Sequence, residues 1–236
     1  MALTLLQIVQ ETCGELGITQ PNAVATSTDD QIKQMHALIN GMGRELYREF
    51  QWQKLVTEYT FSTVASQEAY SLPTDYGYEI NQTEWDKTHH WPLQGPKSSQ
   101  EWQWLKSGII SAGPRFRFRI QGNQIHINPV PGDVYSLGFE YISKYWALAA
   151  DGVTYKEKFT LDDDTCIYDD QLMINGLKAK WQLAKGFDAT ASMAAFNYML
   201  GVCKSQDHSA PTLLISRRQS PLLLTTWSIP ETGYGS

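Results

Sequence analysis

Residues 28–61, TDDQIKQMHALINGMGRELYREFQWQKLVTEYTF, contain the change of pattern that decides the fold. In residues 28–52 apolar side chains recur at steps of three and four, which is the pattern of an amphipathic helix. In residues 54–61 apolar and polar side chains alternate, which is the pattern of a strand. Helical patterns precede this stretch and return near Asp170, and the segment between them is rich in strand patterns. This order predicts an α+β fold, in which a β domain is inserted between the second and third helices of a helical body.

Short-range signals predict where the helices begin and end. A capping box pairs an N-cap hydroxyl with a Gln or Glu side chain three residues later. The pairs with this spacing are Thr4 with Gln7, Thr28 with Gln31, and Ser98 with Glu101. We therefore expect Thr28 to cap the long helix. Gly17 and Gly186 are placed to end helices, the second between the two helices of an antiparallel pair. Gly41 and Gly43 lie inside the long helix, where each glycine costs about 1 kcal/mol, and we expect a bend or a close helix crossing there.

The central segment, residues 54–146, has the pattern of short strands. Turn signals separate them about every 8 to 12 residues, which is typical of a small antiparallel β-sandwich or barrel. Gly122 and Asn123 predict a tight hairpin turn within this segment.

These patterns predict the domain organisation. Four helices form one body from residues 1–53 and 166–206, with residues 54–146 as the inserted domain and residues 147–165 as a loop. Residues 207–236 are expected to form an extended tail. This tail contains apolar runs that would be an aggregation liability if left free, so we expect it to dock, most simply on a neighbouring subunit.

The composition fits two accounts equally. Only 19% of the residues are charged, below the usual quarter or so, and the chain has eight Trp and twelve Tyr. Surfaces that are buried on assembly are depleted in charge and enriched in aromatics, but a Trp-rich β core has the same composition. The net charge of −6 argues against tight binding of nucleic acid, whose affinity comes mostly from Lys and Arg on phosphates. An acidic chain can still surround DNA without holding it.

The sequence predicts no cofactor and no metal site. Cys13, Cys166 and Cys203 are odd in number and lack ligand spacing, so we expect small apolar fillers in a reducing compartment. The acidic residues 162–164, with Asp169 and Asp170, lack the ligand pattern of a calcium loop. We expect them to supply negative charge to the N-terminus of the helix that follows. No signal peptide and no apolar run long enough to cross a membrane is present, so we expect no membrane partner.

A basic stripe is the clearest local feature. Residues 115–120 alternate arginine with apolar residues, so the arginines share one face of a strand. They could contact DNA phosphate or an acidic neighbouring protein, or they could be the wet face of an edge strand. Together with apolar and basic residues of the tail they make up the candidate interface. Its residues are Arg115, Arg117, Arg119, Leu213, Leu214, Arg217, Arg218, Leu222 and Trp227.

No catalytic signature is present, and we predict no catalytic residue. Two alternatives stay open because their residues are brought together in space and not in sequence. A cell-wall hydrolase would use a pair of carboxylates from the strand segment, where the candidates are Glu58, Glu79, Glu84 and Glu140. A carbohydrate-binding module would use a stacking platform of tryptophans, where the candidates are Trp85, Trp91, Trp102 and Trp104.

Two motifs and the order of the elements carry a resemblance. The long helix ends in an aromatic segment, residues 49–52 (EFQW), which leads into strands, and residues 71–75 (SLPTD) follow. A late helical pair lies in residues 161–200. In these features the chain resembles the head-to-tail connector adaptor proteins of tailed, in particular short-tailed, bacteriophages. The likeness covers roughly residues 1–206.

The resemblance implies a structural protein of the virion and not an enzyme. Adaptors of this kind form a ring, typically of twelve copies, beneath the portal protein at the head–tail junction, after assembly in the host cytoplasm. The ring extends the DNA channel, through which DNA passes without specific binding, and offers a platform for tail tube, nozzle or fibre proteins. C-terminal segments commonly reach onto the portal or a neighbouring subunit.

Overall fold

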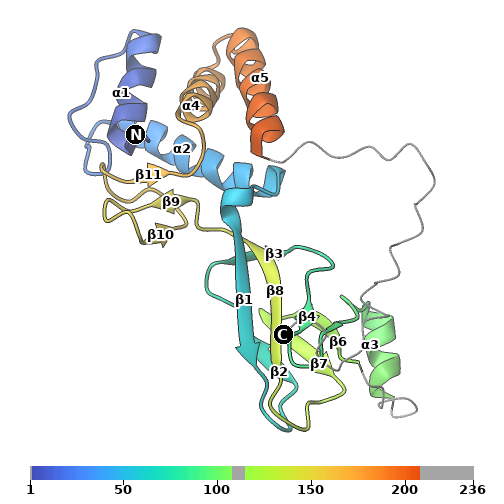
Figure 1. Cartoon of the computed structure of the whole chain (residues 1–236). Coiled ribbons are helices and arrows are strands. Elements are labelled where there is room, and N and C mark those ends of the chain that lie inside the picture. The colour runs from blue at the N-terminus through green and yellow to red at the C-terminus, as the bar shows by residue number, and fades with distance from the viewer. Residues whose placement is uncertain (1, 108–114, 208–236) are drawn as a thin grey trace. The chain divides into compact units, whose positions relative to one another are not determined.

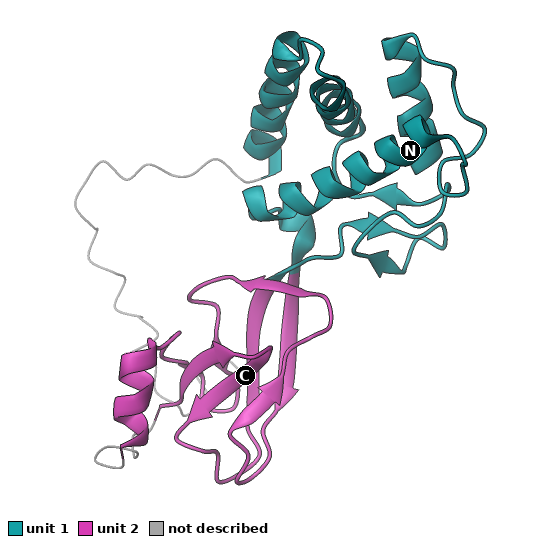
Figure 2. Ribbon diagram, turned by 180° about the vertical axis from the view of Figure 1, so that it is seen from behind, with its two compact units in different colours: residues 1–56, 142–210 teal, residues 57–141, 211–236 magenta. Residues whose placement is uncertain are grey.

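The computed structural model describes residues 2–107 and 115–207 (Figure 1). These residues form five α-helices, one short 3-10 helix and several antiparallel sheets, so the α+β class is confirmed. They divide into two compact units, which Figure 2 shows in different colours. Unit 1 comprises the described residues of Met1–Val56 and Ile142–Ala210, and unit 2 comprises those of Thr57–Tyr141.

Unit 1 contains the helices α1 (Leu5–Leu16), α2 (Asp30–Glu49), α4 (Asp170–Lys185) and α5 (Thr190–Asp207). α4 lies against each of the other three helices (Figure 1). The apolar stripe predicted for the long helix is buried in this packing, because one face of an amphipathic helix must be removed from water. Its buried members are Ile32, Met35, Ile39, Met42 and Leu46.

Most of the predicted helix ends are confirmed. Thr4 completes a capping box at the start of α1, and Ser98 completes one at the start of α3 (Ser99–Lys106). Gly17 and Gly186 end α1 and α4 in the left-handed conformation, with φ of 69° and 77°. Both glycines follow the rule that a residue without Cβ adopts this conformation at least cost.

The helix predicted for residues 28–52 is shorter at both ends. Asp29 is the N-cap, and the prediction of Thr28 was wrong. The Asp29 carboxylate accepts the N–H of Gln31 at 2.8 Å, and its negative charge also favours the positive end of the helix dipole, which a threonine hydroxyl does not. The helix ends at Glu49 because the backbone is extended at Phe50, with φ of −154°.

Glycines allow close packing in unit 1, at one expected and one unexpected place. A Cβ on Gly43 would overlap the indole ring of the fully buried Trp146, whereas a Cβ on Gly41 would meet nothing. The expectation was a bend or a close helix crossing, and the close neighbour at Gly43 is instead a tryptophan ring from outside the helices. Gly176 in α4 was not predicted to matter, and a Cβ there would overlap the sulfur of Met42 in α2 and crowd the ring of Phe196 in α5.

A small sheet lies where a loop was expected. The strands β9 (Ala147–Leu148), β10 (Tyr155–Lys156) and β11 (Thr165–Cys166) pair antiparallel in the order β10-β9-β11. Two-residue strands are too short to produce a periodic signal in the sequence. Trp146 and Phe159 flank this sheet, are buried, and pack edge to face with ring centroids 4.9 Å apart.

Unit 2 contains two antiparallel sheets. A 3-10 helix, Gln53–Leu55, leads into the first of them. This sheet has the order β1-β8-β4-β5, and β3 also pairs with β8. Its strands are β1 (Val56–Ser62), β3 (Tyr76–Glu79), β4 (Trp85–Asp86), β5 (Trp91–Pro92) and β8 (Ser136–Ser143).

The second sheet has the order β2-β7-β6, from β2 (Ala69–Ser71), β6 (Arg117–Gln121) and β7 (Gln124–Asn128). The tight turn predicted between β6 and β7 is confirmed, with φ of 60° at both Gly122 and Asn123. Side chains of both sheets share one core of mainly aromatic and branched residues. Its buried members are Tyr70, Leu72, Leu93, Phe118, Ile125, Ile127, Leu137, Phe139 and Tyr141.

Candidate interaction surfaces

Two arginines of the predicted basic stripe, Arg115 and Arg119, contact side chains of their own unit. Phe118 between them is fully buried, so the alternation of faces is as expected. The guanidinium of Arg115 lies over the ring of Trp91, 5.7 Å from its centroid. Arg119 donates a hydrogen bond of 3.0 Å to the Ser99 hydroxyl at the start of α3. These contacts orient Arg115 and Arg119, so a phosphate or carboxylate partner would meet two arginines that are already positioned.

The other residues of the candidate interface belong to the tail. Leu213, Leu214, Arg217, Arg218, Leu222 and Trp227 lie outside the described residues. The structure therefore brings together only the arginine members of that set.

The carboxylates of unit 2 fall into two groups with different environments. Burial raises the pKa of Glu84, and burial together with the neighbouring Glu84 charge raises the pKa of Glu79. Glu58 forms an ion pair with Lys87, and this hydrogen bond and charge lower its pKa. A glycoside hydrolase needs a carboxyl group of raised pKa in the cleft that binds substrate.

A shallow hollow of about 350 Å³ lies on the first sheet of unit 2. Neither carboxyl group of raised pKa is among its lining residues, and the Glu58 that lines it is held ionised by Lys87. The two carboxyl groups of raised pKa therefore lie outside the lining of this hollow. The lining residues are Glu58, Gln82, Thr83, Trp85, Lys87, Gly138, Phe139 and Glu140.

The four candidate tryptophans have different roles. Trp102 is buried in the core, whereas Trp104, on the same short helix, is exposed. The ring of Trp91 stacks with His89 at 5.4 Å and also carries the guanidinium of Arg115. A ring that its own chain already covers is a poor platform for a sugar.

The acidic residues before α4 have functions that the sequence did not predict. Asp169 is the N-cap of α4 and Asp170 lies in its first turn, as expected for helix charge. Asp162 instead accepts the N–H groups of Val24 and Ala25, at 2.9 and 2.7 Å. For Asp162 the expectation of helix charge was wrong, because these amides lie far away in the sequence and only folding brings them close.

Asp164 is also engaged elsewhere, and is fully buried. It accepts hydrogen bonds from the Lys156 ammonium at 2.8 Å and from the amides of Thr160 at 2.7 Å and Leu161 at 2.9 Å. Burial opposes its ionisation, but these donors outweigh burial and lower its pKa. This carboxylate therefore closes the loop between β10 and β11, and helix charge was the wrong expectation for it too.

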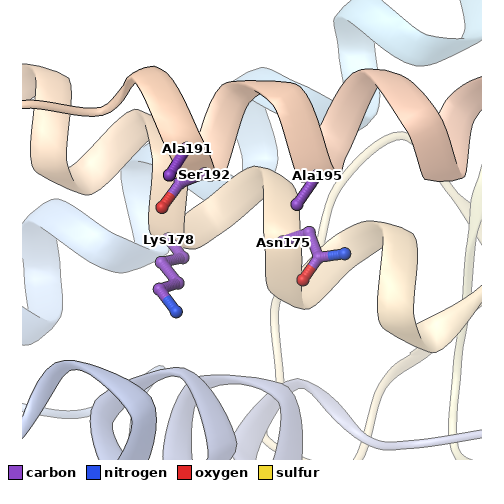
Figure 3. A pocket seen from close by; sticks show the side chains of 5 residues that line it. All are labelled: Asn175, Lys178, Ala191, Ser192 and Ala195. Carbon is purple, nitrogen blue, oxygen red and sulfur yellow. The ribbon is translucent and has the colours of Figure 1, made fainter.

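A small pocket of about 150 Å³ lies between α4 and α5 (Figure 3). Its lining residues are Asn175, Lys178, Ala191, Ser192 and Ala195. The Lys178 ammonium also forms an ion pair of 2.8 Å with Glu15 of α1. Across residues 2–107 and 115–207, no group of three or more His, Cys, Asp or Glu could hold a metal ion.

Unit 1 exposes two groups of large apolar side chains. One, which we name the helical patch, consists of Leu183, Phe187 and Tyr198 at the end of α4 and on α5. The other, the strand patch, consists of Val153, Tyr155 and Leu161 in and beside β10. Exposed apolar groups of this kind mark surfaces that contact other proteins.

The fold defines an α+β protein whose exposed apolar side chains are candidates for contact with other proteins. None of the described helices is long and apolar enough to cross a membrane. A search among curated proteins found no match.

The family model described as SU10 adaptor protein matches residues 3–218, nearly the whole chain. The chain therefore belongs to the SU10 adaptor protein family, and its resemblance to phage head-to-tail adaptors is confirmed. Membership makes it a structural adaptor of a phage virion.

Proposed function

We propose that the chain forms a ring of twelve copies between the portal and the tail of a phage particle. There it extends the DNA channel and offers a platform for tail tube, nozzle or fibre proteins. The observation that carries this proposal is the family match over residues 3–218. In this account the protein catalyses no reaction and needs no cofactor.

We assign a part of this function to each segment. The helical body, residues 1–53 and 166–206, forms the ring, and residues 54–146 form the inserted small sandwich or barrel domain. The tail, residues 207–236, docks on the portal or on a neighbouring copy. The contacts of α4 with three other helices support a rigid body, and the apolar runs of the tail support docking. The arginine stripe of unit 2 then faces an acidic neighbour in the tail.

The net charge supports a channel through which DNA passes in preference to a protein that binds DNA. At −6 the chain repels phosphate weakly, so DNA can move through a channel that twelve such chains enclose without being held at any point. A DNA-gripping protein would instead need a surplus of Lys and Arg.

Mixing the purified protein with its cognate portal ring tests the proposal. Native mass spectrometry should give the mass of one portal ring plus twelve copies of this chain, and cryo-electron microscopy should show the copies as one ring on the portal. Absence of a complex, together with absence of the protein from purified particles, would overturn the proposal.

A further inference from the structure

The helical patch lies on a helix whose surface is unusually apolar. Residues 189–203, which include most of α5, contain no charged side chain. Cys203 is the one buried residue within α5. Leu183, Phe187 and Tyr198 are 58%, 59% and 75% exposed. A helix that is apolar on most of its surface is normally covered. In the described part of unit 1, α4 covers only one side of α5 (Figures 1 and 2).

Two carboxylates order the turns that carry the strand patch. Val153, Tyr155 and Leu161 are 77%, 50% and 57% exposed. The Asp151 carboxylate accepts the N–H groups of Val153 and Thr154, both at 2.9 Å, and so fixes the turn before β10. Asp164 fixes the turn that carries Leu161. Because these turns are ordered before binding, little conformational entropy is lost when a partner covers them.

The two patches lie on opposite sides of the same compact unit. In Figure 1, α5 and the small sheet of β9, β10 and β11 are at opposite edges of unit 1, and the reverse view of Figure 2 shows the same separation. A contact that joins two different surfaces of identical chains is head-to-tail and repeats from copy to copy. Patches on opposite sides of one rigid unit suit this kind of contact, which closes into a ring when the rotation per copy allows it.

The charges beside the two patches differ. Residues 171–206, which include the helical patch, contain four lysines and one aspartate. Residues 151–164, which include the strand patch, contain five acidic residues and two lysines. Three of the helical lysines pair with glutamates of α1 and α2, and the charges left beside the patch, on the exposed Lys185 and Asp188, cancel. Beside the strand patch Asp151, Glu157 and Asp163 are exposed together with one exposed lysine, Lys158, so this rim is acidic. Two acidic rims repel each other, so the charges disfavour pairing of two strand patches and permit pairing of a strand patch with the helical patch.

We propose that the helical patch of one copy packs against the strand patch of the next copy, so that this contact closes the ring. The proposal rests on the ring assembly proposed above and names the surfaces that make it. Tyr198 is the expected centre on one side and Val153 on the other, because they are the most exposed members of their patches. Covering both removes apolar area from water, which is the main driving force of association.

Single substitutions and their mixture test the proposal in the presence of the portal. Tyr198→Asp or Val153→Asp, each tested alone, should weaken ring formation about tenfold or more, because each places a charge in an apolar contact. The two variants mixed should form a dimer and no ring, since each supplies the patch that the other lacks. Val134→Asp, which changes an exposed valine of unit 2, should assemble as the native chain does. Circular dichroism and thermal unfolding establish that each variant is folded.

The outcomes separate the two proposals. If the native chain forms no ring on the portal, the proposed function fails. If the native ring forms and the Tyr198 and Val153 variants form it equally well, the contact assigned here is wrong. Assembly that survives both substitutions but is lost on deletion of residues 208–236 would assign the contact to the tail instead.

Discussion

At the residue scale, a buried carboxylate organises one end of unit 1. Asp164 accepts hydrogen bonds from an ammonium and from two backbone amides, and none of its surface is exposed. Its pKa is lowered from the ordinary value of 3.8. The stabilisation it provides is therefore complete above that value and is lost as the pH falls through the lowered pKa.

Removing this carboxylate should be costly. Asp164→Ala is expected to lower the free energy of unfolding by about 3–5 kcal/mol, because the Lys156 ammonium and two amides lose their partner inside the protein. Urea unfolding at pH 7 measures the loss. Asp163→Ala, which changes the exposed neighbouring residue, should cost less than about 0.5 kcal/mol. Equal effects of the two substitutions would show that burial of Asp164 is not the cause.

Glu84 should make unit 2 depend on pH in the opposite sense. Burial raises its pKa above the ordinary value of 4.5. The contribution of the neutral side chain to the stability of the protein is therefore complete below pH 4.5 and is lost as the pH rises through the raised pKa. The Glu84→Gln variant has no carboxyl group to ionise at this position, so its stability does not fall in this way as the pH rises. The melting temperature of the variant, relative to the native chain, should rise from pH 4 to pH 8. The exposed Glu140→Gln is the control, and a constant difference for Glu84→Gln would contradict the prediction.

At the element scale, α2 offers a matched pair of glycines two residues apart. Gly41→Ala should stabilise the protein by up to about 1 kcal/mol, because alanine favours the helix and the position faces open space. Gly43→Ala should destabilise it by about 1–3 kcal/mol, because the new methyl group overlaps the buried ring of Trp146. Thermal unfolding of both variants measures the change in stability relative to the native chain. Stabilisation by both substitutions would mean that Trp146 can move aside.

At the scale of the whole molecule, folding and docking should separate. Deletion of residues 208–236 removes the tail but keeps Asp207, whose carboxylate accepts the N–H of Gln53 at 2.7 Å. The free energy of unfolding should change by less than about 0.5 kcal/mol, since the described contacts remain. Binding to the portal, measured by co-sedimentation, should be lost. An unfolded truncated chain would contradict this prediction, and so would one that binds the portal as tightly as the full chain.

Features that depend on a few neighbouring residues could be predicted from the sequence. The capping boxes at Thr4 and Ser98, the helix-ending glycines and the turn at Gly122 and Asn123 all follow from local backbone chemistry. The N-cap of α2 was missed by one residue because three candidate capping side chains, at residues 27–29, compete within one turn.

Features that depend on distant residues could not be predicted. Nothing near Gly176 in the sequence shows that Met42 and Phe196 will press on it. The three strands of the small sheet are two residues long and exist only because β9 pairs on both of its edges. For the candidate interface, the sequence placed the arginines on one face, but Trp91 and Ser99, which orient two of them, come from other elements.

The sequence by itself determined the α+β class, the order of the elements, most of the helix ends and the family to which the chain belongs. These depend on periodicity and on short motifs, which are carried by residues close together in the chain. Only the tertiary structure decided that Asp162 binds the backbone of Val24, that Asp164 is buried, and that α5 and the small sheet lie at opposite edges of unit 1. Asp162 and Val24 are more than 100 residues apart in the sequence, and no local pattern records that they meet in space.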